Sequence, residues 1–203
     1  MKGLILKDLY TIKTQAKMYL IIMFGLCAVT IINGGNGGSV GGMICVLAAM
    51  LPITALAYDE RSKWEHYALT MPVSRRDMVL SKYILGIIAE VATLVLSMAI
   101  MAITSKNIVE AIGVSFVFFA IGIFIMSFLL PIMFKVGVEK GRVLMIIILL
   151  LPTFLIIFLN KLNIPAPSGD FLKYLIYLSP VILLAIFVLS IFVSIAIYKK
   201  KEM

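Results

Sequence analysis

Residues Tyr83–Thr104 read YILGIIAEVATLVLSMAIMAIT, a run of 22 residues in which Glu90 is the only charged side chain. An α-helix rises about 1.5 Å per residue, so a helix over this run is about 33 Å long. That length crosses the hydrocarbon core of a bilayer. The run therefore predicts a membrane-spanning helix.

The composition of the whole chain extends this prediction. Of its 203 residues, 63% are hydrophobic and 14% are charged, and the mean hydropathy is +1.13. About 25% of the residues of a typical soluble domain are charged. A soluble domain of this size could not bury so much apolar surface. We therefore predict an all-α membrane protein, with a single transmembrane domain over residues 1–203.

Further apolar runs bring the predicted number of transmembrane helices to six. In chain order, the predicted spans are Met18–Asn33, Ser39–Tyr58, Tyr83–Thr104, Ile108–Phe134, Val143–Leu159 and Pro180–Tyr198. Three of these spans contain a proline that can kink its helix, namely Pro52, Pro131 and Pro152.

The last connection, residues 160–179, is rich in proline and glycine and is predicted to form an external loop. Asp170 can cap a short surface helix over Phe171–Leu178, and Ser179 followed by Pro180 then starts the last span. A plain irregular loop is the alternative.

The basic residues predict the orientation. With the N-terminus inside, 15 of the 18 Lys and Arg residues fall in inner segments, and only Lys106, Lys161 and Lys173 fall outside. This asymmetry follows the positive-inside rule and predicts that both termini are cytoplasmic. The net charge of +8 is thus explained by topology, and the bases form no single face that would bind nucleic acid.

Residues 1–17 show the periodicity of an amphipathic helix. Ile5, Leu9 and Ile12 share one apolar arc, and Lys2 and Lys13 flank it. Such a helix is expected to lie on the inner leaflet and to turn into the first span. It serves either as a positively charged anchor or as an interface helix that touches a cytosolic partner.

Residues 59–82, here called the elbow, are the most informative inner segment. They contain nine of the 28 charged residues, the only Trp and the only His. Pro72 is expected to interrupt the helix of the first half, and Ser74 and Asp77 form a capping-box pattern that starts the third span. The segment is too short to be an enzyme, but it has the right size to be held by another protein. A charged loop with aromatic membrane anchors is the alternative.

Few residues suggest chemistry. Glu90 is the one acid in the interior of a predicted span, since Glu110 lies at the very start of the fourth. We expect Glu90 to face the bundle interior or a cavity, because a charge in lipid is costly. Cys27 and Cys45 lie in apolar runs and are expected to be unpaired thiols. The sequence contains no nucleotide-binding or catalytic motif and no metal-ligand spacing, so we expect no enzyme activity, no cofactor and no metal.

Several stretches resemble a known family. The start Lys2–Leu9, the segments Asp59–Trp64 and Leu69–Arg75 in the elbow, and Ser81–Tyr83 are similar to the small permeases of type-2 ATP-binding-cassette (ABC) exporters of Gram-positive bacteria. Within that family the chain resembles permeases of peptide exporters, including those that expel phenol-soluble modulins. Met71 departs conservatively from the Leu that is common there.

The resemblance implies specific partners and contacts. It implies a bacterial plasma-membrane protein that binds two cytosolic ATPase subunits, which use the ATP, and that pairs with a second permease. It implies that the elbow holds the coupling helix that docks on the ATPase, and that residues 1–17 form the interface helix beside it. The implied ATPase contacts are Asp59, Glu60, Arg61, Lys63, Trp64, Glu65, Arg75 and Arg76.

The sequence thus favours a transport subunit that moves amphipathic or hydrophobic peptides, or similar solutes, out of the cell. The alternative is a six-span substrate-binding module of a vitamin-type importer, although the outer loops offer few polar groups for such a ligand. An intramembrane enzyme would need paired acids or a Ser/His pair within the spans, and neither is present.

Overall fold

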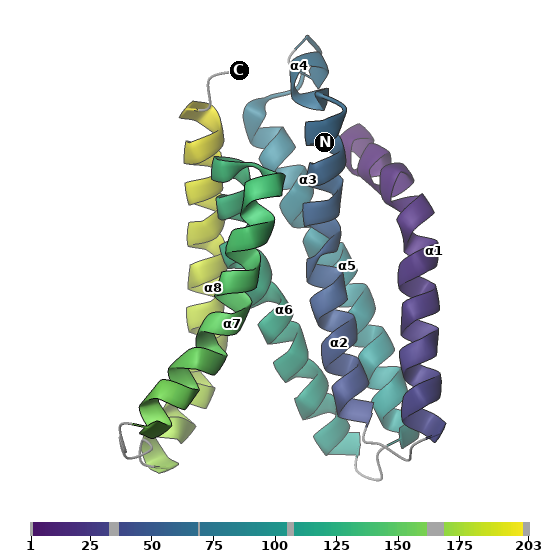
Figure 1. Cartoon of the computed structure of the whole chain (residues 1–203), viewed down its shortest axis with the longest axis vertical. Helices are drawn as coiled ribbons and strands as arrows, with labels where there is room; N and C mark the ends of the chain where they lie inside the picture. The colour runs from purple at the N-terminus through teal and green to yellow at the C-terminus, as the bar shows by residue number, and fades with distance from the viewer. Residues whose placement is uncertain (1, 33–36, 69, 105–107, 162–168, 201–203) are drawn as a thin grey trace.

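The computed structural model describes residues 2–32, 37–68, 70–104, 108–161 and 169–200. In these ranges all regular secondary structure is helical. The helices are α1 (Lys2–Ile32), α2 (Gly37–Ala49), α3 (Leu51–Arg61), α4 (Trp64–Ala68), α5 (Arg75–Thr104), α6 (Ile108–Val136), α7 (Val138–Lys161) and α8 (Gly169–Lys200). Figure 1 shows the long helices side by side, with the short α4 at one end of the bundle.

The predicted spans correspond to these helices. Among the described residues, the segments long and apolar enough to cross a membrane are Gly41–Arg61, Arg75–Ala102, Ile112–Val136 and Leu178–Lys200. They match the second, third, fourth and sixth predicted spans. The first and fifth predicted spans fall in α1 and α7, where many side chains lie outside the described set, so the number six stays a prediction.

Two prolines act differently from each other. Pro52 lies in the first turn of α3, directly after the helix breaks at Met50, so the predicted kink of the second span is present as a short interruption. Pro180 lies inside α8, which continues from Gly169 to Lys200. The expected separate surface helix ending before Ser179 is therefore wrong. A proline removes only one backbone donor, and a long helix can continue through it.

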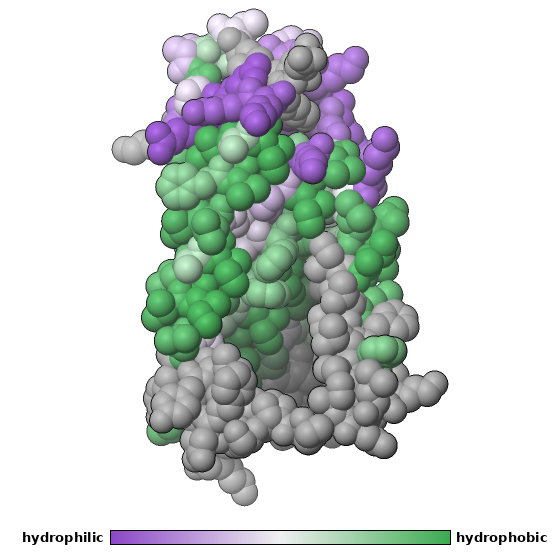
Figure 2. Space-filling model, turned by 90° about the vertical axis from the view of Figure 1, so that its left-hand side faces the viewer, coloured by the Kyte–Doolittle hydropathy of each residue, from purple (hydrophilic) through white to green (hydrophobic). Residues whose placement is uncertain are grey.

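The distribution of polar side chains is that of a membrane protein. Large apolar side chains such as Val95 and Phe192 are exposed on the outside of the bundle, at 62% and 61%. Serines are buried inside it, among them Ser97, Ser127 and Ser194. Figure 2 shows hydrophilic residues gathered at one end above a hydrophobic belt, and Figure 1 places α4 and both chain ends at the corresponding end.

Helix α5 is the centre of the bundle. It contacts α1, α2, α3, α6 and α8. Near its start, the Tyr83 ring packs edge-on against Phe187 of α8 at 5.5 Å between centroids. The Tyr83 hydroxyl lies 2.6 Å from Ser190 Oγ and 2.8 Å from Ser194 Oγ. The Ser190 hydroxyl in turn donates to the Ser127 carbonyl of α6 at 2.5 Å, so this chain of hydrogen bonds joins three helices.

Replacing Tyr83 with Phe tests this network. Y83F keeps the ring contact but removes the hydroxyl, and hydrogen bonds between helices in a membrane contribute about 0.6 to 1.7 kcal/mol each. We expect the free energy of unfolding, measured by SDS titration in mixed micelles, to fall by about 1 to 2 kcal/mol. Tyr67→Phe is the control, because Tyr67 is 62% exposed. Equal stability of Y83F and the wild type would show that the hydroxyl does not hold α8.

Candidate functional site

The elbow contains a sharp reversal between α3 and α4. Helix α3 ends at Arg61, and the Ser62 hydroxyl donates back to the Tyr58 carbonyl at 2.8 Å. Lys63 follows with a backbone φ of 51°, in the left-handed region that residues other than glycine rarely adopt. The chain thereby turns directly into α4, and α4 is held against the end of α3.

The second half of the elbow confirms the capping box. The Asp77 amide donates to Ser74 Oγ at 3.1 Å, and the Ser74 amide donates to Asp77 Oδ2 at 3.4 Å. Pro72 stands in the turn before them, and α5 begins at Arg75. The residues between α4 and α5 therefore end in a fixed helix start, as the sequence predicts.

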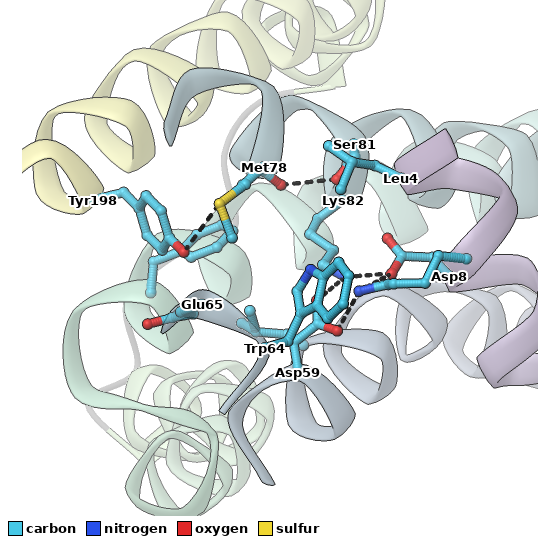
Figure 3. Close-up of a pocket in the computed structure, with 12 residues that line it drawn as sticks. Leu4, Asp8, Asp59, Trp64, Glu65, Met78, Ser81, Lys82 and Tyr198 are labelled. Atoms are coloured by element: carbon cyan, nitrogen blue, oxygen red, sulfur yellow. Dashed lines mark hydrogen bonds and ion pairs between the residues drawn. The ribbon is translucent and has the colours of Figure 1, made fainter. Parts of the chain in front are cut away.

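Four charged side chains meet at the base of the elbow, here called the charge cluster: Lys7, Asp8, Asp59 and Lys82. The Lys82 ammonium group lies 2.8 Å from Asp8 Oδ1 and 2.5 Å from Asp59 Oδ2. Lys7 pairs with Asp59 and lies 3.1 Å from Asp8 Oδ1. The side chains of Lys82 and Asp8 are only 4% and 2% exposed, so water screens these pairs little. Figure 3 shows Lys82 pointing between the two carboxylates.

The charge cluster closes the elbow. Asp59 is the first residue of the elbow and Lys82 the last, so their ion pair ties its two ends together. Lys7 and Asp8 join the start of α1 to the same point. In Figure 1 the first turns of α1 lean toward α3, in agreement with these contacts. A movement of the elbow therefore acts at once on α1, α3 and α5.

Trp64 of α4 covers the charge cluster. Its ring lies over the Lys7 ammonium group at 4.6 Å, which is within the range of a cation–π interaction. The same side chain packs against the buried core formed by α3, α5, α6 and α8. The cavity between Trp64, the cluster and Tyr198 has a volume of about 10 Å³. It has room for about one water molecule and none for a transported solute. The charge cluster therefore connects helices and does not bind a solute, and it is called the joint below.

The other implied ATPase contacts divide into two groups. Glu60 and Arg75 make contacts within the chain. Glu60 Oε2 accepts a hydrogen bond of 2.7 Å from the Val138 amide and so caps α7, and Arg75 donates to the Lys199 carbonyl of α8 at 2.9 Å. Glu65 is half-buried beside Tyr198 and has a partner. By contrast, the side chains of Arg61, Lys63 and Arg76 are exposed.

Helix α1 shows one face that the sequence pattern did not reveal. The buried side chains are Leu4, Asp8 and Ile12, at 8%, 1% and 5% exposure. Ile5 is half-buried, and Leu9 is 45% exposed. The expected apolar arc thus includes one residue of the packed face, Ile12, and one exposed apolar residue that a membrane can cover, Leu9.

Lys7, Asp8 and Lys82 are not among the site residues expected from the sequence. The two lysines are explained there by the positive-inside rule alone, and no role is predicted for Asp8. One signal was available. Leu4, Asp8 and Ile12 are spaced four residues apart and therefore lie on one helix face. An acid between two aliphatic residues on such a face indicates a buried partner of opposite charge.

A second cavity, of about 540 Å³, lies among α1, α2 and α6 and is open to the surroundings. Its lining is apolar and consists of Ile22, Gly42, Met43, Val46, Leu47, Phe118 and Ile121. A cavity of this size and character accepts an apolar group.

Cys45, in the same helix as four of these residues, is a free thiol, whereas the side chain of Cys27 lies outside the described residues.

These features define a multi-pass helical membrane protein with a charged elbow at one end. A family model described as an ABC-2 family transporter protein matches residues 3–199, nearly the whole chain. The chain therefore belongs to the ABC-2 family, whose members are the membrane permeases of ABC transporters. This confirms the resemblance to an ABC-2 permease. No curated protein matches the chain significantly.

Removing one cation from the charge cluster tests its role. Lys82→Met leaves two acids with one lysine in a buried site, and breaking a buried ion pair in this way costs about 3 to 5 kcal/mol. We expect a loss of that size in SDS titration. The double variant Lys82→Met with Asp8→Asn removes one charge of each sign and should regain most of the loss.

Lys13→Ala is the matched control, because Lys13 is an exposed lysine of α1. Its effect should stay within about 0.5 kcal/mol. If K82M is as stable as K13A, the cluster does not hold the elbow.

Proposed function

We propose that this ABC-2 permease is the membrane subunit of an exporter that moves amphipathic or hydrophobic peptides, or similar solutes, out of the cell. Two cytosolic ATPase subunits bind and hydrolyse the ATP, and a second permease completes the transport path. Membership of the ABC-2 family supports an ATPase partner. The observation that carries the proposal is that the charge cluster closes the elbow. A partner docked on the elbow is thereby connected to α1, α3 and α5 through buried ion pairs.

The proposed topology has six spans, with α1 and α7 supplying the first and the fifth. The elbow, the turn between α6 and α7 and both termini then face the cytoplasm of a bacterial cell. Two observations support this orientation. The basic residues are concentrated in these segments, and hydrophilic side chains gather at the end that holds α4.

The proposed docking surface for the ATPase is the exposed side of the elbow. It presents Arg61, Lys63 and Arg76, together with Tyr67, which is 62% exposed. Arginine and aromatic side chains are enriched in protein interfaces. The start of α1, which is joined to the elbow by Asp8 and Lys82, acts as the interface helix. Glu60 and Arg75 contribute indirectly, because their side chains hold the elbow to α7 and α8.

The proposed mechanism follows from these contacts. ATP-driven motion of the docked subunit displaces α4 and the end of α3. Asp59 transfers that displacement to Lys82 and Lys7, and therefore to α5 and α1. The apolar cavity borders α1, so a shift of α1 changes its shape. The chain itself is not an enzyme in this proposal and binds no nucleotide.

The alternative function is the six-span substrate-binding module of a vitamin-type importer. The apolar lining of the larger cavity favours an amphipathic cargo over a polar vitamin. The subunit composition of the purified transporter separates the two. Export predicts this permease, a second permease and ATPase subunits, whereas the importer predicts an additional scaffold permease and a bound vitamin.

Charge reversal on the elbow tests the docking surface. Arg61→Glu and Arg76→Glu change exposed groups, so we expect the melting temperature of the permease to stay unchanged. The ATPase that co-purifies with the permease should bind at least about tenfold more weakly, a change of about 1.4 kcal/mol. Stimulation of ATP hydrolysis by an amphipathic peptide in proteoliposomes should fall in parallel.

Lys140→Glu is the control, since Lys140 is an exposed base of α7 outside the elbow. Normal binding and normal stimulation in R61E and R76E would contradict docking through the elbow. The direction of transport is measured in the same proteoliposomes with ATP outside. Export predicts that the peptide moves from the side with ATP into the vesicle.

A further inference from the structure

Glu90 is a buried acid near the middle of the bundle. It lies close to the centre of the span Arg75–Ala102, and its exposure is 0%. Neither carboxyl oxygen has a hydrogen-bond partner among the described residues. The side chain does not line either cavity described above. The joint at the elbow and the proposed transport path therefore leave this group unexplained.

Glycines on α5 and α6 explain how the side chain fits. A methyl group built on Gly122 of α6 would lie 2.5 Å from Glu90 Oε2 and 2.6 Å from Glu90 Cδ. In the same way, a methyl group on Gly86 of α5 would overlap the sulfur of Met126 on α6. Each helix thus has a glycine that faces a long side chain of the other helix. On each helix the glycine lies four residues before that helix's own long side chain. A larger residue at either glycine would force the facing side chain to move.

Charged groups that could balance an ionised Glu90 are distant. Among the described residues on the helices packed against α5, Cys45 of α2 is a titratable group that interacts electrostatically with Glu90, and its side chain forms a hydrogen bond with Thr93. The Thr93 hydroxyl itself donates to the Glu90 backbone carbonyl at 3.0 Å. On α5 the nearest groups are Tyr83, which faces α8, and Lys82, about 12 Å away along the helix and already paired with Asp8 and Asp59.

Among the described residues, the carboxyl group therefore has neither a paired cation nor a hydrogen-bond donor. An ionised carboxylate in such a site carries the full cost of desolvation, whereas a protonated carboxyl is neutral.

We propose that Glu90 is a proton-binding site of the contact between α5 and α6. The carboxyl holds its proton in the arrangement seen here, and it transfers that proton to water when α5 and α6 separate and the site becomes wet. One O–H bond breaks, a carboxylate and a hydrated proton form, and no other reactant takes part. The ligand is the proton alone, and the site does not depend on the proposed ATPase or cargo.

The contact between α5 and α6 depends on pH in a definite direction. Low pH favours the closed contact between α5 and α6, and high pH favours its separation, because only the separated state exposes a carboxylate to water. The free energy that closes the contact is complete below the pH at which a solvated carboxyl ionises, about 4.3. It declines as the pH rises above that value.

Infrared spectroscopy tests the protonation directly. The purified permease in lipid nanodiscs at pH 7 should show the C=O stretch of a protonated carboxylic acid. A carboxyl group in contact with water is ionised at this pH and gives no such band. The band should be absent in Glu90→Gln. A wild-type spectrum at pH 7 without this band would overturn the proposal.

A pH profile of unfolding supplies the second measurement. SDS titration between pH 5 and pH 8 should show the unfolding equilibrium constant of the wild type rising by up to about tenfold per pH unit relative to E90Q. If Glu90 only fills space, the unfolding constants of the wild type and E90Q differ by the same factor at every pH. Such parallel profiles would therefore also overturn the proposal.

Gly122→Ala gives a readout when E90Q does not fold. It displaces the carboxyl from its site, so the carboxylic acid band at pH 7 should weaken or disappear. Gly113→Ala is the matched control on the same helix, since no atom lies within 4 Å of a methyl group built there. An unchanged band in G122A would contradict the site as described. Because none of these experiments contains an ATPase, their failure would leave the proposed export function untouched.

Discussion

The ion pair between Lys82 and Asp59 is the interaction on which the arrangement of this permease depends. The two residues lie at opposite ends of a 24-residue segment, and both are buried. A buried ammonium group is stable only where carboxylates surround it. Lys82 therefore fixes where α3 ends relative to α5, and through Asp8 it also fixes the first turns of α1. The position of α4 and the cover formed by Trp64 follow from that joint.

The bundle below the charge cluster uses a different kind of contact. Lipid gives no hydrophobic force between helices, so close packing and hydrogen bonds must hold them together. Tyr83 and two serines of α8 provide the hydrogen bonds, and the glycine slots at Gly86 and Gly122 provide the close packing. All of these contacts involve α5. One helix thus carries a residue of the charge cluster, the hydrogen-bond network that holds α8, and the buried acid Glu90.

Sequence patterns predicted the local features well. The helices follow from long apolar runs, and the start of α5 follows from Ser74 and Asp77, because a capping box is a contact between residues three apart. The break before Pro52 was also predictable. Pro180 was misjudged, because its effect on a helix depends on whether neighbouring residues continue the helix on both sides. The contact between Asp8 and Lys82 is not predictable from the sequence, because a single sequence does not tell which charges 74 residues apart come into contact.

The sequence by itself determined that this chain is a helical membrane protein, because hydropathy and length are properties of the chain alone. The match of the family model over residues 3–199 also places it in the ABC-2 family. The tertiary structure decided which charged residues of the elbow face inward and which remain exposed. It placed Asp59 and Glu60, neighbours in sequence, in an ion-pair cluster and in a helix cap on α7 respectively. It also decided that Glu90 meets a glycine and no cation. The reason is physical: the ionisation and exposure of a side chain depend on the residues packed against it, and packing brings these together from distant parts of the chain.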